Sequence, residues 1–269
     1  MRHSPLNLIL LICVATLAGG CVSVKGPTSK LDPLESYNRT MYKINDSVDK
    51  AVLKPVSRTY DKITPSPLKT GFRNFFSNIG EIPVVFNDLL QFQFQQAAYD
   101  TWRFIINSTL GLGGFLDIAS DAGLEKHDED FGQTLGTWGV PSGPYFVIPI
   151  LGPSTIRDSA GRLADAPFKP IGYVTPDSAK YGLYVADGVV TRASLLGASN
   201  VLGEAALDPY VFVRDAYLQR RLKQVYDGKV PQEKLDELEE AEDPADTKPD
   251  AKPEPKSEPA TEPKPETTK

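Results

Sequence analysis

The sequence predicts an all-α protein with one helical body, one short hairpin and a disordered C-terminal tail. Three observations support this class. Proline stands near the first turn of five amphipathic segments, where its missing N–H costs no hydrogen bond. Only residues 145–151 (YFVIPIL) resemble a strand, and Pro149 confines that strand to an edge or a hairpin. After Val230 the aromatic residues stop and proline and acid take over.

The first expected helix opens at Asp32-Pro33-Leu34-Glu35. These residues offer an N-cap acid, a proline at the first helical position and a glutamate placed to complete a capping box. An amphipathic helix of this kind typically packs its apolar side in a core, and here the opposite side carries Arg39, Lys43 and Asp46. Its apolar stripe recurs at spacings of three and four residues, at Leu34, Tyr37, Met41, Ile44 and Val48.

The later helices follow the same rules. Ser66-Pro67 opens a segment with phenylalanines at 72, 75 and 76, Pro83 begins another through Leu90, and 95–110 has one apolar face. Thr175-Pro176 and Asp208-Pro209 open helices over roughly 176–196 and 209–227, and Gly228 is the expected stop of the last one.

Residues 131–156 carry no charged side chain. Their five glycines and four prolines exclude a continuous helix. An uncharged, irregular segment tolerates membrane depth only where its backbone is buried in protein or lines a cavity. In a soluble protein the same stretch would form a core hairpin with loops, and both alternatives stay open at this point.

Residues 1–20 are expected to be a signal peptide. Arg2 and His3 precede an apolar run, and small residues lead to Cys21. The segment resembles a bacterial lipoprotein signal, which implies acylation of Cys21, a tether over 21–31 and, with valine at position 22, export to the outer membrane. The usual leucine stands four rather than three residues before Cys21, so an ordinary secretory signal cleaved near Gly20 is the alternative.

Residues 231–269 form the predicted tail. They hold thirteen acids and six lysines, so the rest of the chain is close to neutral and offers no electrostatic footprint for nucleic acid. A weak acidic helix over Gln232–Asp243 is possible by composition, and the remainder has too little apolar area to fold. The tail is either a solvated spacer or a contact to the cell wall or a partner.

Catalytic and cofactor motifs are poor. Only His3 and His127 exist, and no G-x-S-x-G element is present, so a serine hydrolase such as a phospholipase is disfavoured. Residues 126–130 (KHDED) are interpreted as a solvated connection, because neighbouring residues on a polar loop rarely converge on one metal ion. We therefore expect no enzyme, no cofactor and no metal site.

Charged residues interrupt otherwise apolar helices. In a soluble bundle they would be exposed or paired, whereas in a membrane-embedded body such residues face an interior or a water-filled cavity. An apolar cavity with a few cations would suit a lipid with a phosphate head group. The candidates are Arg157, Asp158, Lys180, Arg192 and Arg214.

Four long motifs resemble one known family in order over residues 32–228: DPLESYNRTMYKIND, RFIINSTLGLGGFLDIA, DFGQTLGTWGVPSGPYFVIPILGPSTIRD and DPYVFVRDAYLQRR. They are similar to the MlaA/VacJ family of outer-membrane phospholipid-transport lipoproteins. The resemblance implies a single ring-like domain over 32–230, built of amphipathic helices that enclose an amphipathic channel in the outer membrane. It does not include the proline-rich tail.

The resemblance also implies a function. Phospholipids mislocalised in the outer leaflet would pass through the channel to a soluble periplasmic carrier and on to an ATP-driven inner-membrane complex, with trimeric porins holding the ring. The five charged candidates would line the channel. The implied gating region is Met41, Tyr42, Lys43, Ile44 and Asn45. The alternative is a structural lipoprotein scaffold that clamps porins or reaches the cell wall.

Overall fold

The computed structural model describes residues 32–199 and 206–242. Within them the regular structure is helical except for one two-stranded antiparallel sheet, so the predicted all-α class is confirmed. The helices are α2 (Glu35–Val48), the π-helical turn η1 (Asp49–Leu53), α3 (Lys54–Ile63), α4 (Ser66–Ile79), α5 (Glu81–Leu90), α6 (Phe94–Thr109), α7 (Ile118–Asp121), α8 (Phe131–Thr137), α9 (Ile156–Asp165), α10 (Asp177–Ser194), α12 (Pro209–Val225) and α13 (Gln232–Glu242). The short 3₁₀ turns η2 (Ala166–Phe168) and η3 (Pro170–Tyr173) join α9 to α10.

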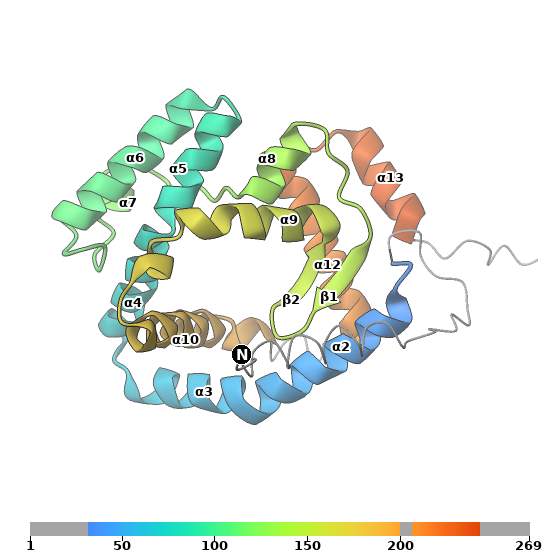
Figure 1. Cartoon of the computed structure of the whole chain (residues 1–269), viewed down its shortest axis with the longest axis horizontal. Coiled ribbons are helices and arrows are strands. Elements are labelled where there is room, and N and C mark those ends of the chain that lie inside the picture. Colours follow the sequence, from blue (N-terminus) through green and yellow to red (C-terminus); the bar gives the residue numbers. More distant parts are fainter. Residues whose placement is uncertain (1–31, 200–205, 243–269) are drawn as a thin grey trace, which may run out of the picture.

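The elements form a closed ring (Figure 1). α2, η1 and α3 run along one side, and α3 packs against α10. Contacts then pass from α10 to α4, α5, α8 and α9, and from α9 to the hairpin. The hairpin returns the chain of contacts to α2, so the ring-like architecture expected from the resemblance is confirmed. Across the described ranges, every helix is too short or too polar to cross a membrane.

Polar groups dominate the buried positions of the ring. Among the described residues, twenty buried side chains are polar or charged and nine are apolar. Large apolar side chains instead lie on the surface, with Leu112, Ile150 and Leu163 each about three-quarters exposed. Charged residues are almost never fully buried in soluble proteins unless they are paired. The ring therefore buries mainly polar groups, many of them in ion pairs, and presents large apolar side chains at its surface.

The expected start of the first helix is wrong, and its expected packing is wrong in part. Asp32 caps nothing; Leu34 occupies the N-cap position without a side-chain hydrogen bond, and Asp32 is completely buried. Part of the stripe that was expected in a core is open to the surroundings, since Ile44 and Val48 are 45% and 37% exposed, whereas Tyr37 and Met41 are half-buried. The buried residue of α2 is Asn38. Periodicity identifies an apolar face of a helix, but not the medium that this face meets.

The charge-free stretch 131–156 folds as α8, a loop and the hairpin. β1 (Tyr145–Ile148) pairs with β2 (Gly152–Thr155), with Tyr145 opposite Thr155, so the hairpin indicated by Pro149 is confirmed. A small apolar cluster lies behind β1, formed by Tyr145, Val147, Tyr210 and Leu218.

α8 and α9 cross very closely. A Cβ atom on Gly161 would overlap the backbone of Gly132, so the crossing requires glycine at this position. This approach brings Asp130, the N-cap residue of α8, close to Asp158 of α9 and so positions the charged network described below.

Two helix starts marked by proline were predicted well: α4 begins at Ser66 and α12 at Pro209. At the start of α12 the Asp208 carboxylate accepts hydrogen bonds from the N–H groups of Tyr210 and Val211. α5 starts two residues before Pro83. The helix suggested for the start of the tail is present as α13, and its Leu238 packs against the apolar cluster. The predicted signal peptide, Cys21, the tether and residues 243–269 lie outside the described residues.

Candidate functional site

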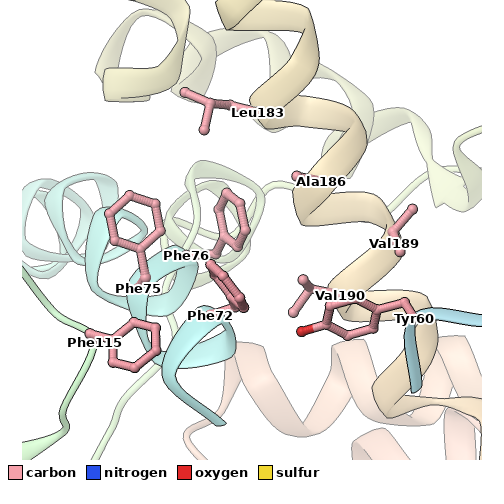
Figure 2. A pocket seen from close by; sticks show the side chains of 9 residues that line it. All are labelled: Tyr60, Phe72, Phe75, Phe76, Phe115, Leu183, Ala186, Val189 and Val190. Carbon is pink, nitrogen blue, oxygen red and sulfur yellow. The ribbon is translucent and has the colours of Figure 1, made fainter. Parts of the chain in front are cut away.

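An apolar cavity of about 420 Å³ lies where α3, α4 and α10 meet (Figure 2). Aromatic rings from α4 face aliphatic side chains from α10 across it. The lining residues are Tyr60, Phe72, Phe75, Phe76, Phe115, Leu183, Ala186, Val189 and Val190. The volume falls within the range of small-molecule pockets, which is about 300–1,000 Å³. The site therefore suits an apolar chain rather than a polar ligand.

The sequence builds this cavity from helical spacing and one glycine. Phe72, Phe75 and Phe76 are three and four residues apart, so they share one side of α4. Phe115 reaches the same wall from the loop after α6 and packs edge-on against Phe72, with ring centroids 5.7 Å apart. A Cβ on Gly71 would overlap the Phe115 ring, so glycine at position 71 makes room for it.

A second, polar cavity of about 220 Å³ adjoins the apolar one and shares Tyr60 and Val190 with it. Lys69 and Arg73 line it, and Lys69 Nζ lies 2.7 Å from Asp61 Oδ1. The Tyr60 hydroxyl at the boundary is buried and has no hydrogen-bond partner among the described residues. Burial raises the pKa of Tyr60, so the hydroxyl stays protonated and able to donate. An acyl-sized space therefore borders a site with two cations.

Of the five predicted channel-facing residues, Arg157 and Asp158 lie together in a buried network between α8, α9 and α12. Arg157 Nη2 is 3.2 Å from Asp158 Oδ1. Asp158 also accepts hydrogen bonds from Arg221 and from the Tyr217 hydroxyl. Arg221 in turn pairs with Asp130 at 2.7 Å. These charges hold three helices together.

Arg214 lies in a different buried group beside the hairpin. Its guanidinium is 2.7 Å from Asp215 and 3.6 Å from Asp32. Asp32 also accepts hydrogen bonds from Asn38 and from the Tyr210 hydroxyl. Arg214 therefore links α12 to the N-terminal end of α2.

The remaining two candidates lie on α10. Arg192 pairs with Asp49 of η1 at 2.7 Å, and Lys180 pairs with Asp177 one turn away. Each of the five candidates thus has an ion-pair partner, and the structure does not bring all five into one place. Their role as channel-lining groups stays a prediction.

The predicted gating residues lie where α2 meets the hairpin. Asn45 donates to the Ile148 carbonyl at 3.0 Å and accepts from the Ile150 N–H at 2.7 Å. Asn38, seven residues earlier, bonds the Tyr145 carbonyl and the Val147 N–H in the same way. Seven helical residues span about 10.5 Å, and three strand residues span about 10 Å. The two asparagines therefore match the free edge of β1.

Among the other gating residues, Met41 and Tyr42 pack against the apolar cluster behind β1, and Tyr42 meets Tyr210 edge-on. Lys43 and Ile44 are exposed on the outer face. The segment is therefore tied to the hairpin by one face only. The gating role itself stays a prediction.

The interpretation of residues 126–130 as a solvated connection is wrong in part. Asp128 is exposed, but Glu129 is 6% exposed and His127 is half-buried. His127 lies between three acidic side chains, from Asp88, Asp100 and Glu129. Asp88 and Asp100 come from α5 and α6, so sequence neighbours gave no sign of this cluster.

Several buried polar residues escaped the sequence reasoning. Asn38, Arg103 and Arg221 all carry ion pairs or hydrogen bonds that join different elements. An available signal was their position among apolar neighbours on amphipathic segments, but each partner lies far away in the chain. Arg103, for example, pairs with Glu81 on α5 and with Asp117 after α6.

Comparisons with known proteins agree with this architecture. Residues 30–224 match the family model described as MlaA lipoprotein. Proteins named intermembrane phospholipid transport system lipoprotein MlaA from Shigella flexneri and Escherichia coli are each 38% identical over 221 residues, covering 80% of this chain and 87% of theirs. The Haemophilus influenzae protein of that name is 34% identical over 87% of this chain and 95% of its own.

A solved structure described as "Structural basis for maintenance of bacterial outer membrane lipid asymmetry" has 37% sequence identity and a TM-score of 0.63. It covers 71% of this chain and 96% of that chain. The matches in sequence and in structure each extend over most of both partners. This chain belongs to the MlaA lipoprotein family.

Proposed function

We propose that this chain is the lipoprotein of an intermembrane phospholipid transport system and that it takes phospholipid out of the outer membrane. The observation that carries the proposal is the apolar cavity between α3, α4 and α10 with a cationic cavity beside it. Relatives over most of the chain bear the name of that transport system. The fold class and the family agree with this function.

The apolar cavity accepts the acyl part of the lipid. The lining offers only one polar side-chain atom, the Tyr60 hydroxyl, so a hydrocarbon chain loses no hydrogen bond on entry. Burial of one methylene from water contributes about 0.8 kcal/mol. A chain that moves from the bilayer into this cavity exchanges one apolar medium for another, so binding is close to balanced. Balanced binding permits release, which a transporter requires.

The cationic cavity accepts the head group. Arg73 has no ion-pair partner within residues 32–199 and 206–242, and Lys69 shares its charge with Asp61. Arginine and lysine are the residues that bind phosphate oxygens through charge-assisted hydrogen bonds. The Tyr60 hydroxyl, which lies between the two cavities, donates to the ester or phosphate oxygens.

The body of the protein is embedded in the outer membrane in this proposal. α6 exposes Trp102 and Ile105, and α10 exposes Tyr181 and Val185. Contiguous exposed apolar surface on a folded chain marks a site of membrane or protein contact. Acyl chains on Cys21 supply a second attachment, since stable anchoring takes more than one apolar signal.

The direction and the partners complete the proposal. Phospholipid mislocalised in the outer leaflet passes through the ring to a soluble periplasmic carrier, and trimeric porins hold the ring in place. Arg157, Asp158, Lys180, Arg192 and Arg214 line the path, and residues 41–45 gate it through their contacts with the hairpin. No covalent bond changes, so the protein is a conduit and not an enzyme.

Site-specific photocrosslinking tests the lipid site. A photoreactive amino acid at Leu183 or Ala186, inside the cavity, is expected to capture phospholipid in cells. The same amino acid at Ser36, on a polar exposed surface of α2, is the matched control. Equal capture at all three positions, or capture at Ser36 alone, contradicts the assignment of the cavity.

A second experiment blocks the cavity. Ala186→Trp fills it, whereas Val185→Trp adds the same ring one residue away on a side chain that is 66% exposed. The filled variant is expected to accumulate phospholipid in the outer leaflet, as measured by labelling of surface-accessible phospholipid, and the control is not. If both variants retain normal outer-leaflet lipid, the cavity is not on the transport path.

The scaffold alternative is tested at the tail. α13 packs against the body, so the deletion that isolates the tail removes residues 243–269 and leaves α13 in place. Under the transport proposal this deletion leaves outer-leaflet phospholipid unchanged. Loss of lipid asymmetry in the deletion, with normal amounts of protein, would favour a scaffold that acts through the tail.

A further inference from the structure

We propose that Asp88, Asp100 and His127 form a binding site for one divalent transition-metal ion, with Zn²⁺ the best match. Asp88 comes from α5 and Asp100 from α6, two helices that pack against each other. His127 comes from the segment between α7 and α8. The site lies apart from the apolar cavity and is independent of the lipid proposal.

The three side chains have the spacing of metal ligands. His127 Nδ1 lies 3.7 Å from Asp88 Oδ1 and 3.7 Å from Asp100 Oδ2, and one ligand atom from each residue lies within 4.8 Å of the others. Two atoms that each bind Zn²⁺ at about 2.1 Å in a tetrahedron are roughly 3.4 Å apart. Inward movement of a few tenths of an ångström would therefore bring His127 Nδ1 to the spacing of metal ligands from each carboxylate.

The buried oxygens of this cluster lack partners. Both carboxylate oxygens of Asp88, one of Asp100 and the Nδ1 atom of His127 have no hydrogen-bond partner among the described residues. Asp88 and Asp100 are completely buried, and no lysine or arginine of the described ranges forms an ion pair with either. Buried carboxylates are normally paired or coordinate a metal. A cation between them supplies the missing partner.

The surroundings of His127 match a second coordination sphere. Its Nε2 atom faces Glu129 Oε1 at 3.7 Å, and Gln91 donates to the other oxygen of Glu129 at 2.6 Å. Metal-binding histidines usually direct the second ring nitrogen to a carboxylate that orients the ring. His127 and Glu129 also line a cavity of about 600 Å³, which offers the ion a route from solvent.

The ligand set selects the ion class. One imidazole nitrogen with two carboxylate oxygens suits Zn²⁺ and its first-row neighbours, whereas Ca²⁺ and Mg²⁺ take oxygen ligands in larger numbers. Three protein ligands leave a fourth position for water, as in open zinc sites.

The test uses the full chain in detergent without a histidine tag, because such a tag binds the same ions. After treatment with chelator, the protein is dialysed against Zn²⁺, Mn²⁺ or Ca²⁺, and metal per chain is measured by atomic emission. We expect one Zn²⁺ per chain, loss of that ion in Asp88→Asn and His127→Gln, and no uptake of Ca²⁺.

Two matched controls locate the ion. Asp128→Asn removes a carboxylate from the same acidic run that is 66% exposed. Asp227→Asn removes an exposed carboxylate from the neighbouring group of His127, Glu129 and Asp227. Both variants are expected to keep the ion. Equal loss of Zn²⁺ in either control would place the ion elsewhere.

The wild-type protein could take up none of these ions and still capture phospholipid at Leu183. That result overturns the metal proposal and leaves the transport proposal intact. The cluster would then be held by shared protons. If Asp88→Asn does not fold, Glu129→Gln replaces it, with an expected 10- to 100-fold loss of Zn²⁺ affinity. An unchanged affinity in Glu129→Gln also contradicts the site.

Discussion

At the residue scale, Asp158 illustrates how the protein stabilises a buried charged side chain. Its carboxylate accepts hydrogen bonds from Arg221 at 2.8 and 3.1 Å and from the Tyr217 hydroxyl at 2.6 Å. Burial raises the pKa of Asp158, but the hydrogen bonds and charge of Arg221 outweigh burial and lower the pKa below its ordinary value. The ionised form is therefore the one that the fold stabilises.

Asp158→Asn is expected to destabilise the protein strongly, because the Arg221 guanidinium stays buried with one carboxylate partner fewer. Removing one member of a buried pair costs about 3–5 kcal/mol. The measurement is the free energy of unfolding in denaturant, with the protein in micelles. Asp177→Asn breaks the exposed pair with Lys180 instead and is the control, with an expected loss much smaller than that of Asp158→Asn. Similar losses in both variants would show that the buried network is not what holds α9 to α12.

Asp158 also predicts a pH dependence. A carboxyl group whose pKa is lower in the folded state than in the unfolded state contributes stability above its unfolded pKa of about 3.9 and loses it as pH falls through the folded pKa. The unfolding free energy of the wild type should therefore fall below about pH 4–5, and Asp158→Asn should show a shallower fall. Parallel acid curves for the two proteins would assign acid sensitivity to other groups.

At the element scale, the hairpin and α2 form one unit through Asn38 and Asn45. Asn38→Ala removes two hydrogen bonds to β1 and one to Asp32 at a completely buried position. Each unsatisfied buried group costs about 1–3 kcal/mol. We expect faster hydrogen exchange at the N–H of Val147 and a loss of stability of at least about 2 kcal/mol. Thr40→Ala, on the exposed side of α2, is the control and should leave this N–H protected.

The crossing of α8 and α9 gives a second prediction at this scale. Gly161→Ala forces the two backbones apart, and overpacking of this kind costs about 1–3 kcal/mol. Gly188→Ala in α10 adds the same methyl group where nothing lies within 4 Å, so its better helix propensity should raise stability by about 0.5–1 kcal/mol. Thermal unfolding of the two variants should therefore shift in opposite directions. Shifts in the same direction would contradict the close crossing.

The elements also show what sequence reasoning can reach. Asp208-Pro209 and Ser66-Pro67 marked true helix starts because capping and the fixed φ of proline are local effects. α8 and α9 were missed because their glycines lower helix propensity, and tertiary contact with each other compensates for this. The stripe of α2 was identified correctly, but its expected burial was wrong at Leu34, Ile44 and Val48, because a local pattern does not report the surrounding medium.

The candidate site also combines local features that the sequence predicts with long-range contacts that it does not. The phenylalanines of α4 were recognised as one face, yet nothing local indicated that α10 supplies the opposite wall of the cavity. Arg157 and Asp158 were selected for their charge in an apolar context, but Arg221, which pairs with Asp158, lies more than sixty residues away. Long-range partners depend on the closure of the ring, which no window of the sequence contains.

At the scale of the whole molecule, the polarity of the ring determines how it meets a membrane. Apolar side chains cover outer faces of α2, α6 and α10, and ion pairs occupy buried positions. An acyl anchor alone would leave this apolar surface in water, which is unfavourable in proportion to its area. The surface and the anchor are therefore expected to act together.

Membrane attachment through the acyl anchor and attachment through the apolar surface can be tested separately. Cys21→Ala removes the acyl anchor, and the variant should still float with vesicles of outer-membrane lipid because the apolar surface remains. Adding Trp102→Glu and Ile105→Glu, whose side chains are 57% and 41% exposed on α6, should release it. The control adds the same charges at Gln95 and Gln232, which are polar and exposed already. Circular dichroism checks that each variant folds. If Cys21→Ala alone no longer floats with the vesicles, the body does not embed and the acyl chains carry the whole attachment. If the control with charges at Gln95 and Gln232 is released as well, added charge and not the apolar surface of α6 governs binding.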